Sequence, residues 1–115
     1  IPAIPLLPPA KDKQAYLAQI SYTNKIMLNL VELIFKSQKR PFVIILQGDH
    51  GYRFFNEEKN VLEFPNLSAF YFYNRDYRLL HDSLTNINTF PVIFNTFFGQ
   101  QFPMRPDHHY FLKYK

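Results

Sequence analysis

The hydrophobic positions near the beginning of the chain follow a helical spacing. Between Gln14 and Lys36, apolar side chains recur every three or four residues, and polar side chains fall largely between them. The main apolar positions are Tyr16, Leu17, Ile20, Met27, Leu30, Val31 and Ile34. This spacing predicts an amphipathic helix of roughly six turns at ~3.6 residues each. Pro41 then ends the helix.

The next segment has the pattern of a buried strand. Phe42 to Leu46 are five consecutive large apolar residues, three of them β-branched. Such a run predicts a strand buried on both faces, which is typical of a central strand in a sheet covered by helices. A second strand, rich in aromatic residues, is predicted over Leu67 to Tyr73. We expect the two strands to lie side by side.

The last regular element predicted is a short helix. Thr89-Phe90-Pro91 places a proline in a first helical turn, and the helix runs to about Phe98, where Gly99 ends it. Tyr77 to Leu84 is expected to be a short helical or irregular piece, and the tail from Gln100 to be irregular. The order of helices and strands predicts the α/β class, with helices packed on the faces of the sheet.

The first residues have a different composition from the rest. Four prolines among the first ten residues exclude a helix or a ladder strand there. We therefore predict a proline-rich lead-in or linker over residues 1–13 and one domain over residues 14–115. Because the chain begins with Ile1 and not with Met, we expect it to be part of a longer protein.

Composition narrows the class of protein. The chain is 47% hydrophobic and contains 13 phenylalanines and 8 tyrosines, which predicts a folded domain with an aromatic core or an aromatic surface that something else covers. Self-association through exposed aromatics is one way to cover such a surface. The absence of cysteine excludes disulfides, thiolate metal sites and cysteine nucleophiles. No apolar run approaches the ~20 residues that cross a bilayer, so we expect the chain itself to be soluble.

The charge balance favours anionic partners without naming one. The net charge is +4, but the basic residues are scattered, so a nucleic-acid interface has little support. Only Lys36, Lys39 and Arg40 form a small cluster. These bases lie at the end of the predicted helix, where cations suit the helix dipole, and this role is favoured over a phosphate site.

Candidate chemistry lies directly after the first strand, in Gln47-Gly48-Asp49-His50-Gly51. In open α/β sheets, ligands bind beyond the carboxyl ends of strands, and the two glycines allow a sharp turn. Asp49 offers a hard oxygen and His50 a borderline nitrogen, a pair suited to zinc or manganese. Equally compatible with these residues alone is a turn that Asp49 caps and in which His50 is an ordinary loop histidine.

Other polar residues are weaker candidates. Arg53 lies close enough in sequence to pair with an anion bound at Asp49 and His50, although a solvated arginine is slightly favoured. His108 and His109 are alternative metal ligands, but neighbouring histidines rarely bind one ion. His81 lies among leucines, which favours a packed and hydrogen-bonded histidine over a catalytic one.

Several segments together resemble the C-terminal part of the alkaline phosphatase superfamily. The closest group is the sulfatase-like hydrolases and transferases of bacterial membrane-anchored proteins, which include lipoteichoic acid synthases. The resemblance extends from about Tyr16 to Phe111. Its motifs are Tyr22-Thr23-Asn24, Val43 to Gly51, Leu79-Leu80-His81-Asp82-Ser83, Asn88-Thr89-Phe90-Pro91, Asn95 and Phe98-Gly99.

This resemblance implies a fragment of an α/β/α sandwich with few strands flanked by helices. It implies that Asp49 and His50 ligate a catalytic divalent metal, zinc or manganese more than magnesium or calcium. It also implies that the parent protein acts on an anionic phosphate or sulfate ester at the extracytoplasmic face of a bacterial membrane. In the family, a Ser, Thr or modified Cys nucleophile and a further carboxylate ligand lie in the N-terminal part of the domain.

The chain departs from the family pattern because it carries neither of those groups. Ser21, Thr23 and Ser37 belong to the predicted helix or its end and not to a strand-to-helix turn. The chain is therefore expected to hold half of a metal site, to be inactive alone, and to depend on the N-terminal part of the catalytic domain as its partner. The alternative is a non-enzymatic module whose basic and aromatic residues bind nucleic acid or a glycan.

Overall fold

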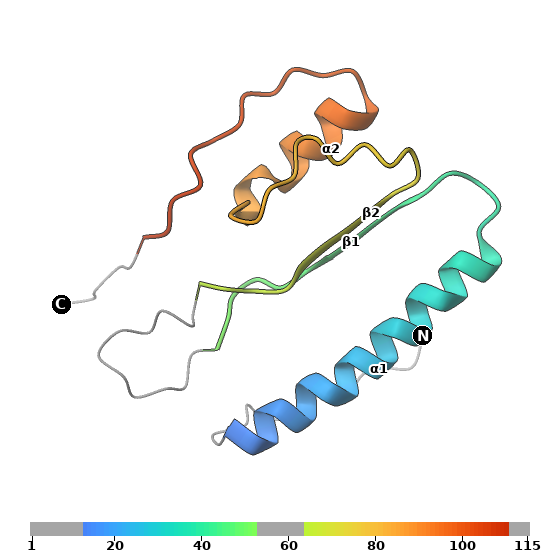
Figure 1. Ribbon diagram of the computed structural model, residues 1–115, viewed down its shortest axis with the longest axis vertical. Helices are drawn as coiled ribbons and strands as arrows, with labels where there is room; N and C mark the ends of the chain where they lie inside the picture. The colour runs from blue at the N-terminus through green and yellow to red at the C-terminus, as the bar shows by residue number, and fades with distance from the viewer. Residues whose placement is uncertain (1–12, 53–63, 111–115) are drawn as a thin grey trace. The chain divides into compact units, whose positions relative to one another are not determined.

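The computed structural model describes residues 13–52 and 64–110, and it divides into two compact units (Figure 1). The first unit is Ile1–Pro41 and the second is Phe42–Lys115. Each is considered by itself. The described residues form two helices and a two-stranded sheet, so the chain belongs to the mixed α/β class. Of the predicted lead-in over residues 1–13, all but Lys13 lies outside the described residues.

The first unit contains helix α1, Lys13–Ser37. Its bounds agree within a residue with those predicted from the hydrophobic spacing. Near its end Lys36 forms an ion pair with Glu32 at 3.4 Å, four residues earlier, which supports the helix only weakly because both side chains are well exposed. The backbone N–H of Gln38 still donates to the Ile34 carbonyl, and the helix ends before Pro41.

The second unit is built on an antiparallel pair of strands, β1 (Val43–Gln47) and β2 (Ser68–Phe72). Val43 lies opposite Phe72 and Gln47 opposite Ser68, so the predicted adjacency of the two strands is confirmed. The expectation that the first strand is buried on both faces is wrong, because Val43 to Leu46 are only half-buried. Within the described residues β1 has a neighbouring strand on one edge only, so it is not the central strand of a sheet that the apolar run predicted.

Aromatic rings fasten the second helix to the sheet. Phe72, at the end of β2, is fully buried between Tyr77, whose ring is stacked on it at 5.2 Å, and Phe97, whose ring meets it edge-on at 5.1 Å. The Phe72 backbone N–H also donates to the Tyr77 hydroxyl oxygen. Phe97 belongs to helix α2, so this cluster joins β2, the turn after it and α2.

Helix α2 spans Thr89–Phe97 and follows a short 3-10 turn, η2, Asn86–Asn88. Its predicted bounds are confirmed to within one residue, with Pro91 in the first turn and Gly99 after the end. Gly99 has φ +62°, a left-handed conformation that glycine adopts without strain. The polar residues before the helix do not cap it through their side chains, because Asn88 makes its bonds elsewhere.

The connections around these elements are irregular. A turn follows β2, in which Arg75 has φ +56° and the Asn74 side chain accepts a hydrogen bond from the Asp76 N–H. The tail from Gln100 to Tyr110 has no regular structure, as predicted. Within the described part of the chain, neither helix combines the length and the apolar character needed to span a membrane.

Candidate functional site

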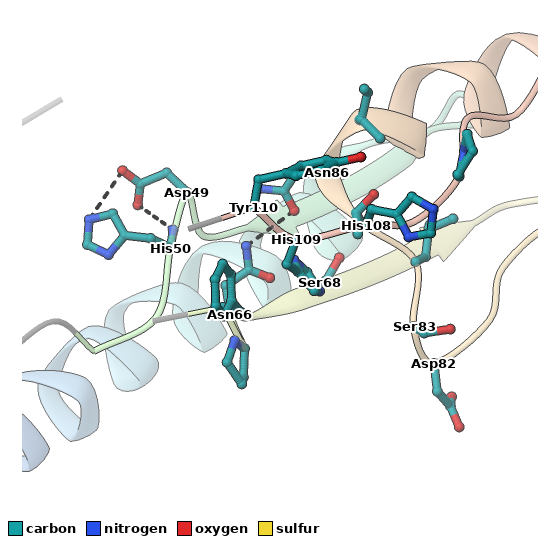
Figure 2. Close-up of a pocket in the computed structure, with 16 residues that line it drawn as sticks. Asp49, His50, Asn66, Ser68, Asp82, Ser83, Asn86, His108, His109 and Tyr110 are labelled. Atoms are coloured by element: carbon teal, nitrogen blue, oxygen red, sulfur yellow. Dashed lines mark hydrogen bonds and ion pairs between the residues drawn. The ribbon is translucent and has the colours of Figure 1, made fainter. Parts of the chain in front are cut away.

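Asp49 and His50 lie in the loop that directly follows β1, and their side chains meet there (Figure 2). The His50 Nδ1 atom lies 2.7 Å from the Gly51 carbonyl oxygen. Because a carbonyl can only accept, Nδ1 carries the proton, and the lone pair of the neutral ring is on Nε2. That atom lies 3.6 Å from Asp49 Oδ2, while Asp49 Oδ1 accepts the His50 backbone N–H at 3.0 Å.

This arrangement has the donor chemistry of a metal ligand pair. Metal-binding histidines generally donate their second ring N–H to a carbonyl or carboxylate, which fixes the tautomer. Two ligand atoms on one tetrahedral zinc at ~2.0–2.1 Å are roughly 3.4 Å apart, close to the observed separation. The Asp49 side chain is 89% exposed and that of His50 35% exposed, so an ion can reach both.

The pair does not by itself form a complete site. Among residues 13–52 and 64–110, no three His, Asp or Glu side chains are grouped so that they could hold a metal ion. A catalytic zinc commonly has three protein ligands and one open position. The described chain thus supplies two candidate ligands and leaves the remaining positions to other groups.

Asparagine side chains fix the backbone just before the pair. The Gly48 carbonyl accepts hydrogen bonds from Asn66 Nδ2 at 2.7 Å and from Asn86 Nδ2 at 2.9 Å. The Gly48 N–H donates to the Leu67 carbonyl at 2.8 Å. Gly48 itself has no left-handed φ, so the sharp turn expected from its glycine character is not what aims Asp49 and His50. The hydrogen bonds to the N–H and to the carbonyl of Gly48 hold the backbone that leads to them.

Gln47 extends this network into α2. Its Nε2 atom donates to Asn86 Oδ1 and to Thr89 Oγ1, both at 2.8 Å. Asn86 Oδ1 is also 3.2 Å from Asn66 Nδ2. The Asn86 amide therefore joins the end of β1, the segment before β2 and the approach to α2, which are far apart in the sequence.

Asp49 and His50 form one margin of a cleft of about 1000 Å³. Figure 2 shows Asn66 and Asn86 close to the loop that carries the pair, and Asp82 and Ser83 well away from it. The other lining residues are Phe64, Pro65, Ser68, Leu84, Thr85, Ile87, Pro106, His108, His109 and Tyr110. Most hydrogen-bonding groups in this lining are neutral, so the cleft combines amides, hydroxyls and imidazoles with aromatic rings.

Asp107 holds the tail beside this cleft. Its Oδ1 atom accepts the Thr85 N–H at 2.7 Å, the Thr85 hydroxyl at 2.6 Å and Asn88 Nδ2 at 2.9 Å. Burial opposes ionisation of Asp107, but these hydrogen bonds and the nearby His81 outweigh it, and the pKa of the carboxyl is lowered. Fully buried Asn88 adds two bonds to the backbone of Arg105, one through each amide atom.

His81 is hydrogen-bonded, as its sequence context suggested, but it is exposed, where that context favoured a packed residue. Its Nδ1 atom lies 3.2 Å from Ser83 Oγ and its Nε2 atom lies 3.3 Å from Asp107 Oδ2, with the side chain about half exposed. The histidine thus lies beside the Asp107 carboxylate, which holds the tail, and helps to keep the pKa of that carboxyl low.

The remaining sequence candidates have different outcomes. Arg53, proposed to pair with an anion, lies outside the described residues. His108 and His109 line the same cleft as Asp49 and His50, and the His109 ring lies against Phe64 with centroids 4.9 Å apart. Neither joins the pair in a metal-binding group within the part of the chain that the structure describes.

Sequence reasoning missed the residues that position the site: Asn66, Asn86 and Asp107. Asn66 and Asp107 each follow a proline, a pattern that signals a turn but does not name a partner. Their bonds reach partners 18 to 22 residues away, and Asn86 reaches 38 residues back to Gly48. Comparison with protein-family models, with curated protein sequences and with solved structures finds no match to this chain.

Proposed function

We propose that Asp49 and His50 are one half of the metal site of a phosphate- or sulfate-ester hydrolase or transferase. The observation that carries the proposal is the bond from His50 Nδ1 to the Gly51 carbonyl, which leaves Nε2 beside Asp49 Oδ2. An imidazole held in this tautomer, next to a carboxylate at near ligand spacing, is prepared to bind a divalent cation. Zinc or manganese suits this nitrogen and oxygen pair better than magnesium or calcium.

Asp49 and His50 would hold the ion. When bound, a divalent ion would activate a nucleophile and stabilise the charge that develops on the ester. Arg53, four residues after Asp49, would pair with the anionic group of the substrate. The nucleophile and the further carboxylate ligand would come from an N-terminal part of the same catalytic domain, so the chain alone would have no turnover.

The resemblance to sulfatase-like enzymes supplies the wider setting of this proposal. It rests on Val43 to Gly51 together with the later motifs near His81, Thr89 and Phe98. In that setting the described elements belong to an alkaline-phosphatase-like α/β/α sandwich. The parent protein is anchored in a bacterial membrane and works on its extracytoplasmic face.

Paramagnetic titration tests the proposal directly. Mn²⁺ added to isotope-labelled protein should broaden the His50 ring signals before those of His81, His108 or His109. Asp49→Ala should weaken this effect about tenfold or more, because one of two ligands is lost. Asp82→Ala is the matched control: it removes another exposed carboxylate from the same cleft and should leave the effect unchanged.

The same protein should not turn over aryl phosphates or aryl sulfates with zinc or manganese present. Broadening that ignores His50, or that is equal in Asp49→Ala, would rule out the assigned ligands. Ester turnover by the chain alone would contradict the proposal that it holds only one half of the metal site.

The alternative function, a basic and aromatic module for nucleic acid or glycans, has less support. The exposed aromatic rings of the second unit include Phe90, Phe94, Phe98 and Phe102. These four lie in a stretch, residues 83–104, that contains no charged residue. Nucleic-acid surfaces place basic side chains next to the stacking rings, and this surface does not.

A further inference from the structure

Asn86 is an exposed residue of η2 with three side-chain hydrogen bonds. Its amide nitrogen donates to the Gly48 carbonyl, and its amide oxygen accepts from Gln47 and from Asn66. An exposed side chain with this many partners contributes little by burial, so its effect must lie in what it holds. The backbone that it holds leads directly into Asp49 and His50.

We propose that Asn86 is the positioning residue of the Asp49–His50 pair, an inference that rests on the proposed metal-binding function. Through the Gly48 carbonyl it fixes the peptide that joins Gly48 to Asp49. On the other side of the pair, Tyr52 is buried, with 8% of its surface exposed. Asp49, His50 and Gly51 are therefore held between two anchored residues, Gly48 and Tyr52, and Asn86 supplies one of the bonds that anchor Gly48.

The chemistry of this anchor needs a carboxamide. Only an amide presents a donor to Gly48 and an acceptor to Gln47 and Asn66 from the same planar group. A carboxylate of the same shape would set an oxygen against the Gly48 carbonyl and repel it. When Asn86 is removed, Asn66 still donates to the Gly48 carbonyl and Gln47 still reaches Thr89, so the fold keeps its connections while the loop loses one restraint.

The test compares Asn86→Ala with Asn95→Ala. Asn95 also bonds the backbone through both amide atoms, to the N–H and carbonyl of Phe102, but it touches nothing at Gly48. The first readout needs no metal: imidazole ¹⁵N shifts report the His50 tautomer, and amide exchange reports order at His50. The second readout is the Mn²⁺ affinity from signal broadening, and thermal unfolding monitors the fold.

Asn86→Ala should lower the Mn²⁺ affinity about tenfold, as changes outside the ligand set commonly do, at a temperature where the protein remains folded. It should also reduce the fraction of His50 with the proton on Nδ1 and speed exchange of the His50 amide. Asn86→Asp should show the same direction of change, since it is isosteric but lacks the donor. Asn95→Ala should change the unfolding temperature alone.

The proposal is overturned if Asn86→Ala keeps both the wild-type tautomer and the wild-type amide exchange at His50. A parallel loss in Asn95→Ala would also overturn it, because the effect would then be general destabilisation. If wild-type protein binds no Mn²⁺ at the pair, the metal-binding function fails. The metal-free readouts still decide whether Asn86 positions His50, so the two failures are distinguishable.

Discussion

Within the described residues, asparagine side chains join backbone segments that are 7 to 38 positions apart in the sequence. Asn66 and Asn86 bind Gly48, Asn88 binds both polar atoms of the Arg105 backbone, and Asn95 does the same for Phe102. A carboxamide suits this role because it carries donors and an acceptor and does not titrate. Among the described carboxylates, Asp107 accepts such bonds and has a lowered pKa, so it links the stability of the fold to pH.

Asp107 is the carboxylate whose removal should cost most. Asp107→Ala removes the acceptor of the Thr85 N–H and of the Thr85 hydroxyl, and one of the two acceptors of the Asn88 amide nitrogen. We expect the free energy of unfolding at neutral pH to fall by about 2–3 kcal/mol, since part-buried donors lose a charged partner. Urea denaturation followed by circular dichroism measures this difference.

The pH dependence of that difference has a definite sign. The pKa of Asp107 is lower in the folded protein than in the unfolded chain, so its contribution is fully present above the unfolded pKa. The contribution is lost as the pH falls through the lower, folded pKa. The gap between wild type and Asp107→Ala should thus narrow in acid, whereas a gap that widens would contradict the assignment.

Asp76 is a second carboxylate with a lowered pKa, and it lies at the surface. Its carboxylate receives two hydrogen bonds from the Arg78 guanidinium, at 2.8 and 2.7 Å, and this pairing lowers the pKa of Asp76 to about 2. Solvent screens an exposed pair of this kind, so it organises the turn after β2 more than it stabilises the unit.

At the scale of the elements, local patterns predicted what depends on local sequence. Helical spacing located α1, and Pro91 with Gly99 located α2, because capping and backbone preferences act within a few residues. The burial of β1 was overestimated, since an apolar run reports what a strand can bury and not what lies beside it. The antiparallel direction of the pair had no local signal.

The end of α2 allows a test of one such local preference. Gly99→Ala should lower the free energy of unfolding by about 1 kcal/mol, because a Cβ is strained at positive φ even though nothing lies within 4 Å of it. Gly48→Ala is the matched control. Its Cβ would meet ordinary contacts of 3.5 Å and longer, and its φ is not left-handed.

The control should stay within about 0.5 kcal/mol of wild type. Thermal unfolding of both variants checks the comparison. Equal losses in the two proteins would mean that the left-handed residue does not limit the stability of this helix end.

In the second unit as a whole, the sequence motif predicted Asp49 and His50 as candidate ligands but did not predict the cleft and the amide network around them. A motif of adjacent residues can be recognised in the sequence. The cleft and the amide network cannot be recognised there, because they combine residues of β1, the start of β2, the approach to α2 and the tail. Their polar contacts obey no spacing rule, so they appear only once the chain is folded.

The second unit has a cluster of exposed aromatic rings. Phe90, Phe94, Phe98 and Phe102 are exposed, and their rings are linked through Phe94 at centroid distances of 5.6 to 6.4 Å. We expect the chain to self-associate through this uncharged face, more strongly at high salt. In sedimentation experiments the double substitution Phe90→Ser and Phe98→Ser should restore the monomer.

Leu67→Ser, which changes an exposed apolar residue elsewhere in this unit, should leave the association unchanged. A wild-type protein that stays monomeric at every concentration reached would remove this role for the exposed rings.

The hydrogen bonds at Gly48 also matter for protein engineering. The bonds from Gly48 to Leu67 and from Asn66 to Gly48 tie together the two ends of the connection between β1 and β2. Because these bonds already bring the two ends of the connection together, lengthening the connection should cost little: doubling the length of a flexible segment costs about 0.6 kcal/mol in closure entropy. We therefore expect this connection to tolerate insertions of different length without loss of the strand pairing, which makes it a suitable place to graft new sequence while the scaffold is kept.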